Sequence, residues 1–105
     1  MDHKLSWSPE ALEDIEAIAS YIGRDSPWYA QIVVTKIIET AQSLREFPES
    51  GRMVPEIAKA SIRERFVYSY RVIYKTDSNG ILVAAVIHGS RLLERLAERI
   101  DNTSI

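Results

Sequence analysis

Two neighbouring segments begin with the same dipeptide, Ser-Pro, and together they constrain the fold more than any other feature. They span residues 8–23 and 26–48, with only Arg24 and Asp25 between them. A serine before a helix accepts hydrogen bonds from the free amides of the first turn, and a proline at the first helical position loses no bond. Apolar residues recur at helical spacing in both segments: Leu12, Ile15, Ile18, Ala19 and Ile22, then Ala30, Val33, Ile37, Ala41 and Leu44. The pattern and the short link predict an antiparallel helical hairpin.

The rest of the chain predicts a sheet. Four segments are expected to form strands: residues 3–7, 62–67, 70–76 and 81–87. The sequence Asp77-Ser78-Asn79-Gly80 between the last two is typical of a tight hairpin turn, because Asn and Gly tolerate positive φ. The run ILVAAVI over residues 81–87 is apolar throughout, which is typical of a strand buried on both faces. Residues 49–61 show no sustained period and predict a loop.

The order of these elements predicts the fold class. It is strand, helix, helix, three strands and then a short helix over residues 91–99. We expect a single α+β domain over residues 1–105, in which the N-terminal helical hairpin packs on one face of a small, largely antiparallel sheet. The other face of that sheet is expected to carry polar side chains or to meet a partner.

Composition narrows the classes of function. The chain has no cysteine and two histidines, and its glycines are isolated, so we expect no metal and no cofactor. The longest apolar run is too short to cross a membrane, and the first residues lack the pattern of a secretory signal. We therefore expect a cytoplasmic protein with no membrane contact.

Charge is distributed unevenly along the chain. The net charge is −2, but residues 1–50 hold four Lys or Arg against nine Asp or Glu, whereas residues 51–105 hold nine against six. This asymmetry is compatible with one face that binds an anionic partner, and equally with basic residues that simply face solvent.

One group of side chains has the chemistry needed to act on phosphate. Arg71 lies in the strand that the turn folds against ILVAAVI, and His88 and Arg91 follow the end of that run. Neighbouring strands are about 5 Å apart, so these side chains are expected to share a pocket. Arginine binds phosphate through paired hydrogen bonds and histidine transfers protons near neutral pH, which suits RNA cleavage. Two alternatives stay open: His88 bonds a nearby carbonyl or faces solvent, and Arg71 pairs with Glu64 or lies at a rim.

Four stretches in this order resemble the RelE/ParE toxin superfamily: SWSPEALEDIEAIASYI, FPESGRMVPE, IRERFVYSYRVIYKT and VIHGSR. The resemblance covers about residues 3–95. It implies the toxin of a type II toxin–antitoxin module, with a helical hairpin on an antiparallel sheet and a tightly bound antitoxin protein as its partner. Trp28 and Tyr29 are then candidate antitoxin anchors, because both residue types are enriched at interface hot spots. Packing against the first helix or the sheet edge is their alternative role.

The superfamily divides by target, and the residues bear on that division. RelE-like members cleave mRNA on the ribosome, whereas ParE-like members inhibit DNA gyrase. In an ungapped comparison with RelE, Arg71 and Arg91 match its arginines, but Ile62 and Glu64 stand where RelE has lysines. The RelE tyrosine falls near Ala97. An acidic side chain at such a position opposes the approach of phosphate.

Two further positions keep the nuclease alternative open. A shift of one residue would place Arg63 and Arg65 where RelE has its lysines. His88 falls close to the catalytic histidine of YoeB-like members.

The opening helix and the HGSR ending resemble ParE and its plasmid-stabilisation relatives more closely. We therefore expect a ParE-like toxin that inhibits growth by binding DNA gyrase and is not an enzyme. The residues expected to bind the target are Arg63, Arg65, Arg71, His88, Arg91 and Arg95. One alternative is a ribosome-dependent mRNA endonuclease with Arg71, His88 and Arg91 as catalytic residues. Another is a degenerate member that binds an antitoxin but is no longer toxic.

Overall fold

The computed structural model describes residues 3–90, and its elements follow the predicted order. The helices are α1 (Pro9–Gly23) and α2 (Pro27–Ser43), and the strands are β1 (Leu5–Trp7), β2 (Arg52–Met53), β3 (Ile62–Val67), β4 (Tyr70–Asp77) and β5 (Gly80–His88). The α+β class and the helical hairpin on a mostly antiparallel sheet are confirmed. The short helix predicted over residues 91–99 lies outside the described residues.

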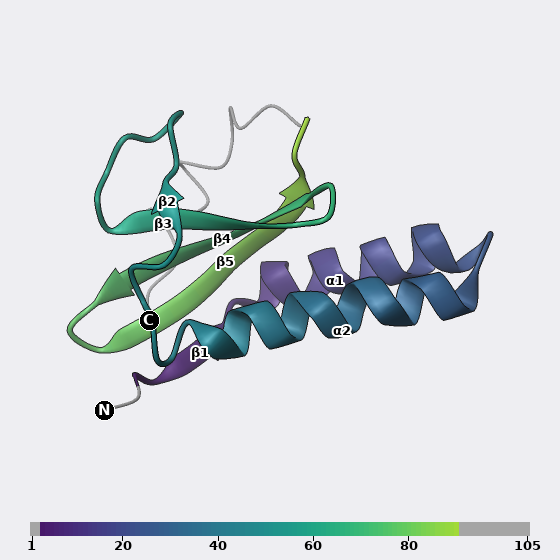
Figure 1. Ribbon diagram of the computed structural model, residues 1–105, viewed down its shortest axis with the longest axis horizontal. Helices are drawn as coiled ribbons and strands as arrows, with labels where there is room; N and C mark the ends of the chain where they lie inside the picture. The colour runs from purple at the N-terminus through teal and green to yellow at the C-terminus, as the bar shows by residue number, and fades with distance from the viewer. Residues whose placement is uncertain (1–2, 91–105) are drawn as a thin grey trace.

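Both helices begin as the Ser-Pro dipeptides predict. The Oγ of Ser8 accepts a hydrogen bond from the Ala11 amide (3.0 Å), and the Oγ of Ser26 accepts one from the Tyr29 amide (3.1 Å). Figure 1 shows the two helices lying side by side along one side of the sheet. The predicted hairpin therefore forms, and its turn lies at one end of the molecule.

The second helix ends earlier than the sequence predicts. Its last residue is Ser43 rather than one near residue 48. The amides of Leu44, Arg45 and Glu46 bond to carbonyls only three residues back, at 3.1–3.2 Å. This tighter turn satisfies the free carbonyl groups at the end of the α-helix and leads the chain away from its axis.

The five strands form one sheet in the order β1-β5-β4-β3-β2. β1 pairs with β5 in parallel, and the other pairs are antiparallel. β5 lies between β1 and β4 with residues 80–87 buried, which confirms the interior strand predicted from ILVAAVI. The predicted hairpin turn is also present: Gly80 has φ +131°, and the Asn79 amide donates to Asp77 Oδ1 (2.6 Å).

An irregularity in β5 distributes its side chains over both faces of the sheet. Ile73 of β4 is opposite Ala85 and Tyr74 is opposite Val83, so Ala84 has no opposing residue. Because of this bulge, Val83 and Val86 both reach the helix side although they are three residues apart.

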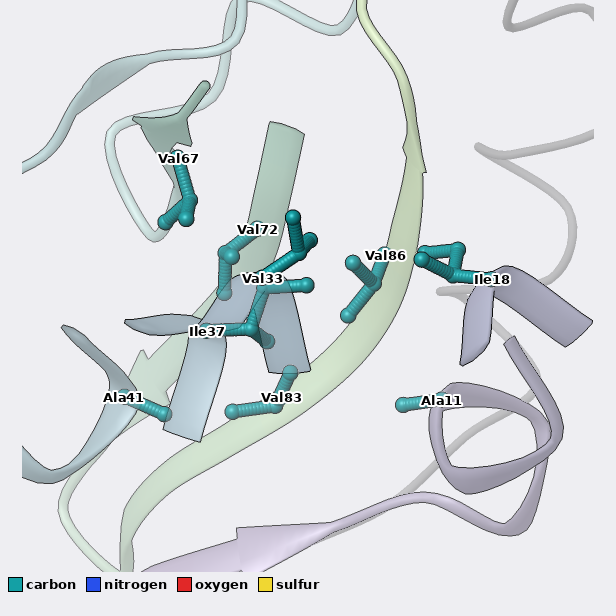
Figure 2. Packing of buried hydrophobic residues seen from close by; sticks show 9 residues of the cluster. All are labelled: Ala11, Ile18, Val33, Ile37, Ala41, Val67, Val72, Val83 and Val86. Carbon is teal, nitrogen blue, oxygen red and sulfur yellow. The ribbon is translucent and has the colours of Figure 1, made fainter. Parts of the chain in front are cut away.

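The main core lies between the helices and the sheet. It contains Ala11, Ile18, Val33, Ile37, Ala41, Val67, Val72, Val83 and Val86. Figure 2 shows Ala11 and Ile18 of α1 directed toward β5, and Ile37 of α2 beside Val83. Burial of these side chains on one face fixes the register of the sheet, since a shift of one residue would turn them to the other side.

The other face of the sheet carries both apolar and charged side chains. Its apolar cluster comprises Val54, Ile62, Ile73, Ala84, Ala85 and Ile87, with Ile57 packed against it. Polar side chains were expected on this face, and Glu64 and Arg71 are indeed there, but both are buried. Val54 and Ile57 belong to the segment predicted as a loop, so the chain itself covers part of this face.

No helix within residues 3–90 has the length and apolar character needed to cross a membrane.

Candidate functional site

Arg71 lies in β4 on the sheet face opposite the helices, and its guanidinium group is buried. The residue is 4% exposed. Its Nε donates to Glu64 Oε1 (2.6 Å), and Nη1 and Nη2 donate to the two carboxylate oxygens of Glu56 at 2.9 Å each. Each nitrogen of the guanidinium group therefore bonds a carboxylate. The ion pair with Glu64 that the sequence left open is confirmed, and Glu56 is a second partner.

Glu64 lies between two arginines. It is 1% exposed, and while its Oε1 binds Arg71, its Oε2 accepts a hydrogen bond from the Nε of Arg52 (2.7 Å). Arg52 is directly opposite Glu64 in the β2–β3 pair. Burial of a carboxylate is costly unless it is paired and hydrogen-bonded, and these two bonds meet that requirement.

Glu56 reaches Arg71 from the short segment that follows β2. The amide of Ala58 bonds to the carbonyl of Val54 (2.8 Å), and Ala58 has φ 56°, in the left-handed region. This single turn directs the Glu56 carboxylate to the sheet. The hydrogen bond from Arg71 holds the pKa of Glu56 below its ordinary value of 4.5, and the bond to Glu56 raises the pKa of Arg71. Arg52, Glu56, Glu64 and Arg71 together are called the ion cluster below.

Arg63 and Arg65 of β3 alternate with Glu64 and so leave the opposite face of the strand. Arg63 donates from Nε to the carbonyl of Ala60 (3.1 Å) and from Nη1 to the carbonyl of Gly51 (2.9 Å). Arg65 donates from Nη1 to the hydroxyl of Ser50 (3.1 Å). These acceptors are neutral, and over residues 3–90 neither arginine pairs with a carboxylate. These hydrogen bonds orient both side chains, and no carboxylate within residues 3–90 neutralises their charge.

Gly51, whose carbonyl accepts the bond from Arg63, is itself held by Tyr74. Its amide donates to the Tyr74 hydroxyl (2.9 Å), and a Cβ atom at Gly51 would lie 2.5 Å from the backbone oxygen of Glu64. Only glycine allows this approach. Burial raises the pKa of Tyr74, and the Gly51 amide and the charges of Arg63 and Arg65 oppose that rise.

His88 ends β5 on the helix side of the sheet, with its side chain exposed. Its Nδ1 accepts a hydrogen bond from the Ser90 amide (3.2 Å) and lies 2.7 Å from the Ser90 hydroxyl. The ring meets Tyr70 edge-on, with centroids 5.7 Å apart. His88, Tyr70, Tyr21 and Asp14 line an open hollow of about 350 Å³.

Aromatic side chains gather near His88. We call Tyr21, Trp28, Tyr29, Tyr68 and Tyr70 the aromatic end. The rings of Tyr29 and Tyr68 are 6.3 Å apart, and Trp28 and Tyr68 line a second hollow of about 430 Å³. Burial raises the pKa of Tyr70, and the nearby Tyr21 and Tyr29 side chains raise it further.

Four members of the aromatic end are open to a partner. Trp28 is 73% exposed, Tyr21 68%, Tyr68 56% and Tyr29 43%. Tyr68 also has φ 54°, a strained conformation for a residue other than glycine. The alternative role of Trp28 and Tyr29 was to pack against the fold. Whatever packing they make, much of both side chains stays exposed.

The structure separates the predicted site residues. Arg71 lies in the ion cluster, Arg63 and Arg65 lie on the other face of β3, and His88 lies at the aromatic end. Arg91 and Arg95 lie outside the described residues. The shared pocket expected for Arg71 and His88 is not observed: Arg71 is opposite Ile87 and His88 is opposite Tyr70, and successive residues of a strand face opposite sides.

Sequence reasoning missed Arg52 and Glu56 of the ion cluster and Tyr21, Tyr68 and Tyr70 of the aromatic end. Glu56 comes from an aperiodic segment, where only an acidic residue near Val54 and Ile57 hinted at a contact. Tyr68 comes from the turn between β3 and β4, where an aromatic residue in a tight turn was the only signal. Within residues 3–90 there is no group of three or more His, Asp or Glu side chains placed to hold a metal ion.

Comparison with known proteins identifies relatives of this chain. Residues 5–93 match the family described as the ParE toxin of the type II toxin–antitoxin system parDE. The chain is 37% identical over 87 residues to Toxin RelE2 of Caulobacter vibrioides, which covers 82% of this chain and 94% of that protein. It is also 37% identical over 49 residues to Putative toxin Y4kP of Sinorhizobium fredii, covering 47% and 51%.

Two solved structures share the fold. The chromosomal ParDE system from P. aeruginosa contains a chain with a TM-score of 0.68 and 19% identity, covering 82% of this chain and 95% of that one. The YoeB dimer from Staphylococcus aureus gives a TM-score of 0.59 at 19% identity, covering 84% and 98%. At this identity the likeness concerns the fold alone.

Proposed function

The chain belongs to the ParE toxin family of type II toxin–antitoxin systems, and on this premise we propose that it arrests growth by binding DNA gyrase rather than by cutting RNA. An antitoxin protein is the partner that family membership implies. Gyrase acts in the cytoplasm, so the toxin works there in this proposal.

The observation that supports an inhibitor over a nuclease is the state of Arg71. Cleavage of RNA needs a cation that can approach the scissile phosphate, together with a group that transfers a proton. All three nitrogens of the Arg71 guanidinium group bond the carboxylates of Glu56 and Glu64. His88 faces the other side of the sheet. A phosphate at Arg71 would have to displace Glu56 and lie beside the negative charge of Glu64.

Supercoiling by purified gyrase tests this proposal. The wild-type toxin should inhibit supercoiling or trap cleaved DNA on the enzyme, in proportion to toxin concentration. Toxin mixed with its antitoxin is the control and should leave the enzyme active. Unimpaired supercoiling at saturating free toxin contradicts the gyrase proposal.

A ribosome-dependent mRNA endonuclease is the second candidate, since the chain is similar to a protein named Toxin RelE2 and shares its fold with YoeB. In that case His88 acts as acid or base through its exposed ring, and Arg71 and Arg91 stabilise the charged transition state, with Arg63 or Arg65 in support. Induction of the toxin should then produce mRNA cut within ribosomes, and His88→Ala should reduce cutting at least tenfold. Cutting that persists in His88→Ala and in Arg71→Ala contradicts this assignment.

We propose that the target binds the surface formed by the residues that the family resemblance implied. Their contacts within the fold divide these residues into two roles. Arg63, Arg65 and His88 are accessible and touch the target directly, as do Arg91 and Arg95. Arg71 supports that surface by holding Glu56 and Glu64 in place. Arg71→Met should therefore weaken inhibition together with stability, whereas Arg65→Gln should weaken inhibition alone.

The antitoxin, in this proposal, binds the aromatic end through Trp28 and Tyr29. Exposed Trp and Tyr rings bury large areas on binding and lose little conformational entropy. The double variant Trp28→Ala/Tyr29→Ala should weaken antitoxin binding at least thirtyfold by calorimetry. Phe47→Ala, which removes a ring that is 61% exposed elsewhere on the molecule, is the matched control and should bind as the wild type does. Unchanged affinity in the double variant contradicts the anchor role.

A further inference from the structure

A hollow of about 710 Å³ lies at the end of the molecule opposite the turn of the helical hairpin. Figure 1 shows the end of α2 and the turn between β4 and β5 at this end. The hollow is lined by residues 46–50, by His3 and by four residues at the β4–β5 turn: Thr76, Asp77, Gly80 and Ile81. We call it the end hollow. We propose that the end hollow binds a basic, partly apolar segment of the protein that the toxin inhibits, an inference that rests on the proposed function.

Most of the wall of the end hollow is apolar, and an exposed aromatic ring belongs to it. Phe47 is 61% exposed, and Pro48 and Ile81 line the hollow with it. Scattered exposed apolar side chains need no explanation, but apolar side chains gathered around a concave surface of this size are typical of a binding site. The end hollow therefore has the room and the apolar contact area for several side chains of a partner.

Three carboxylates determine the charge of the end hollow. Glu46, Glu49 and Asp77 line it, whereas no Lys or Arg does so in the part of the chain that the structure describes. Within residues 3–90 none of the three carboxylates pairs with a cation. A lysine or arginine of a partner would bond these carboxylates and lie against the ring of Phe47, which attracts cations to its face. Charge complementarity therefore favours a basic segment as the occupant.

The fold holds both walls of the end hollow in place. The amide of Phe47 bonds the carbonyl of Ser43 (3.1 Å), and the amide of Ser50 bonds the carbonyl of Phe47 (3.0 Å). On the other side, a Cβ atom at Gly80 would lie 2.4 Å from the backbone oxygen of Lys4, so the β4–β5 turn packs closely on the N-terminal segment. Because a partner need not order these walls, binding costs less conformational entropy.

The end hollow adjoins the surface already proposed for the target. Ser50 lines the hollow, and its hydroxyl accepts the hydrogen bond from Arg65 (3.1 Å). One segment of the target can therefore lie across both, with a basic residue at Glu46 and Glu49 and an acidic residue at Arg65. Charges of opposite sign side by side fix the direction of the bound segment, because the reverse direction brings like charges together. A polypeptide meets this requirement, whereas a small cation would fill the hollow alone.

Affinity for purified gyrase and inhibition of its supercoiling test the inference, with the full-length toxin free of antitoxin. Glu46→Gln/Glu49→Gln should weaken both about tenfold or more, and the affinity should depend less on salt. Phe47→Ala should weaken both about fivefold or more and leave the salt dependence unchanged. The matched control Glu13→Gln/Glu16→Gln removes the same charge from exposed positions of α1 and should change both by less than about twofold.

Other occupants give different results with the same samples. An equal loss of antitoxin affinity in the two hollow variants would place the antitoxin in the end hollow and overturn the inference. Sedimentation that shows a dimeric wild type and monomeric hollow variants would identify a second copy of the chain as the occupant and also overturn it.

The two proposals fail in distinguishable ways. A wild-type toxin that does not bind gyrase overturns the proposed function, and this inference with it. A wild type that binds gyrase no better than both hollow variants do, or an equal loss of affinity in the α1 control, overturns only this inference.

Discussion

Arg71 and Arg65 lie on adjacent strands of one sheet, yet their surroundings differ in one decisive respect. Arg71 is buried and its hydrogen bonds go to two carboxylates, whereas Arg65 is partly exposed and bonds a neutral hydroxyl. Arg63 resembles Arg65, since it bonds two backbone carbonyls. The first arginine is neutralised by the fold, and the other two are only oriented by it.

The difference teaches that an arginine in a strand is assigned a role by its acceptors and not by its position in a motif. A carboxylate both orients and neutralises a guanidinium group, so that the cation serves stability. A neutral acceptor orients the group and leaves its field available to a partner. Substitutions on the two sides of β3 should therefore separate stability from binding.

Glu64→Ala should have the largest effect, because it leaves Arg71 buried with one carboxylate and Arg52 with none. Removal of one partner of a buried ion pair typically costs about 3–5 kcal/mol in the free energy of unfolding. Urea denaturation followed by circular dichroism measures it. Glu49→Gln is the control, because it changes an exposed carboxylate in the turn before β2. It should stay within about 0.5 kcal/mol of the wild type.

The double variant Glu64→Leu/Arg71→Met shows whether charge is the cause. Apolar residues of similar size often replace a buried pair at little cost. We expect it to be more stable than Glu64→Ala by at least about 2 kcal/mol. If the double variant were as unstable as the single one, poorer packing and not an unpaired charge would explain the effect.

Tyr74→Phe should have the next largest effect. The buried Gly51 amide would lose its acceptor, at a cost of about 1–2 kcal/mol. The peptide that holds Arg63 would then be less well fixed, so inhibition of gyrase through Arg63 and Arg65 should weaken as well. Thermal melting and the supercoiling assay on the same sample test both expectations. A variant with the stability of the wild type and weakened inhibition would contradict the comparison, because the bond between Gly51 and Tyr74 would then serve binding and not the fold.

Glu56→Gln should have a smaller effect that depends on pH. The pKa of Glu56 is lowered in the folded state, so its ion pair stabilises the fold above the unfolded value of 4.5, and that stability is lost as pH falls through the folded pKa. Since the Glu56 side chain is 44% exposed, the difference at pH 7 should be about 1 kcal/mol or less. Denaturation at several pH values should show the wild type and the variant converging below pH 4.5. A constant difference across that range would argue against the pair.

Arg63→Gln and Arg65→Gln should have the smallest effect on stability. Neither side chain pairs with a carboxylate in the described part of the chain, and glutamine can still donate to the same acceptors, so each change should cost about 0.5 kcal/mol or less. Urea denaturation decides. A loss above about 1.5 kcal/mol would place these arginines with Arg71 as structural residues, outside the range of ordinary surface changes.

Much of the fold could be predicted because it follows from local rules. The serines before Pro9 and Pro27 fix the helix starts, and Asn79-Gly80 fixes the hairpin turn. The strand β2 was missed because two residues are too few to show alternation. The bulge at Ala84 was missed because an apolar run has no pattern that assigns its residues to one face or the other.

The candidate site was less predictable, because it depends on contacts between distant segments. The pair of Arg71 with Glu64 joins neighbouring strands and was open to sequence reasoning. The contact of Arg71 with Glu56 depends on how residues 49–61 fold over the sheet. This could not be predicted, because the apolar residues of that segment have no regular spacing. The pocket expected for Arg71 and His88 failed for a simpler reason: residues 71 and 88 lie one step out of register.

The pairing of β1 with β5 has a consequence for synthesis of the protein. Leu5 lies opposite Ile81, and Ser8, which caps α1, bonds the carbonyl of Ala84, 76 positions later in the chain. At about 5–20 residues per second, the ribosome adds the strand on which the first helix packs about 4–15 seconds after that helix. Until then the apolar side of the helical hairpin has no sheet to cover it. The nascent toxin therefore acquires its surfaces only when its last described strand has left the ribosome.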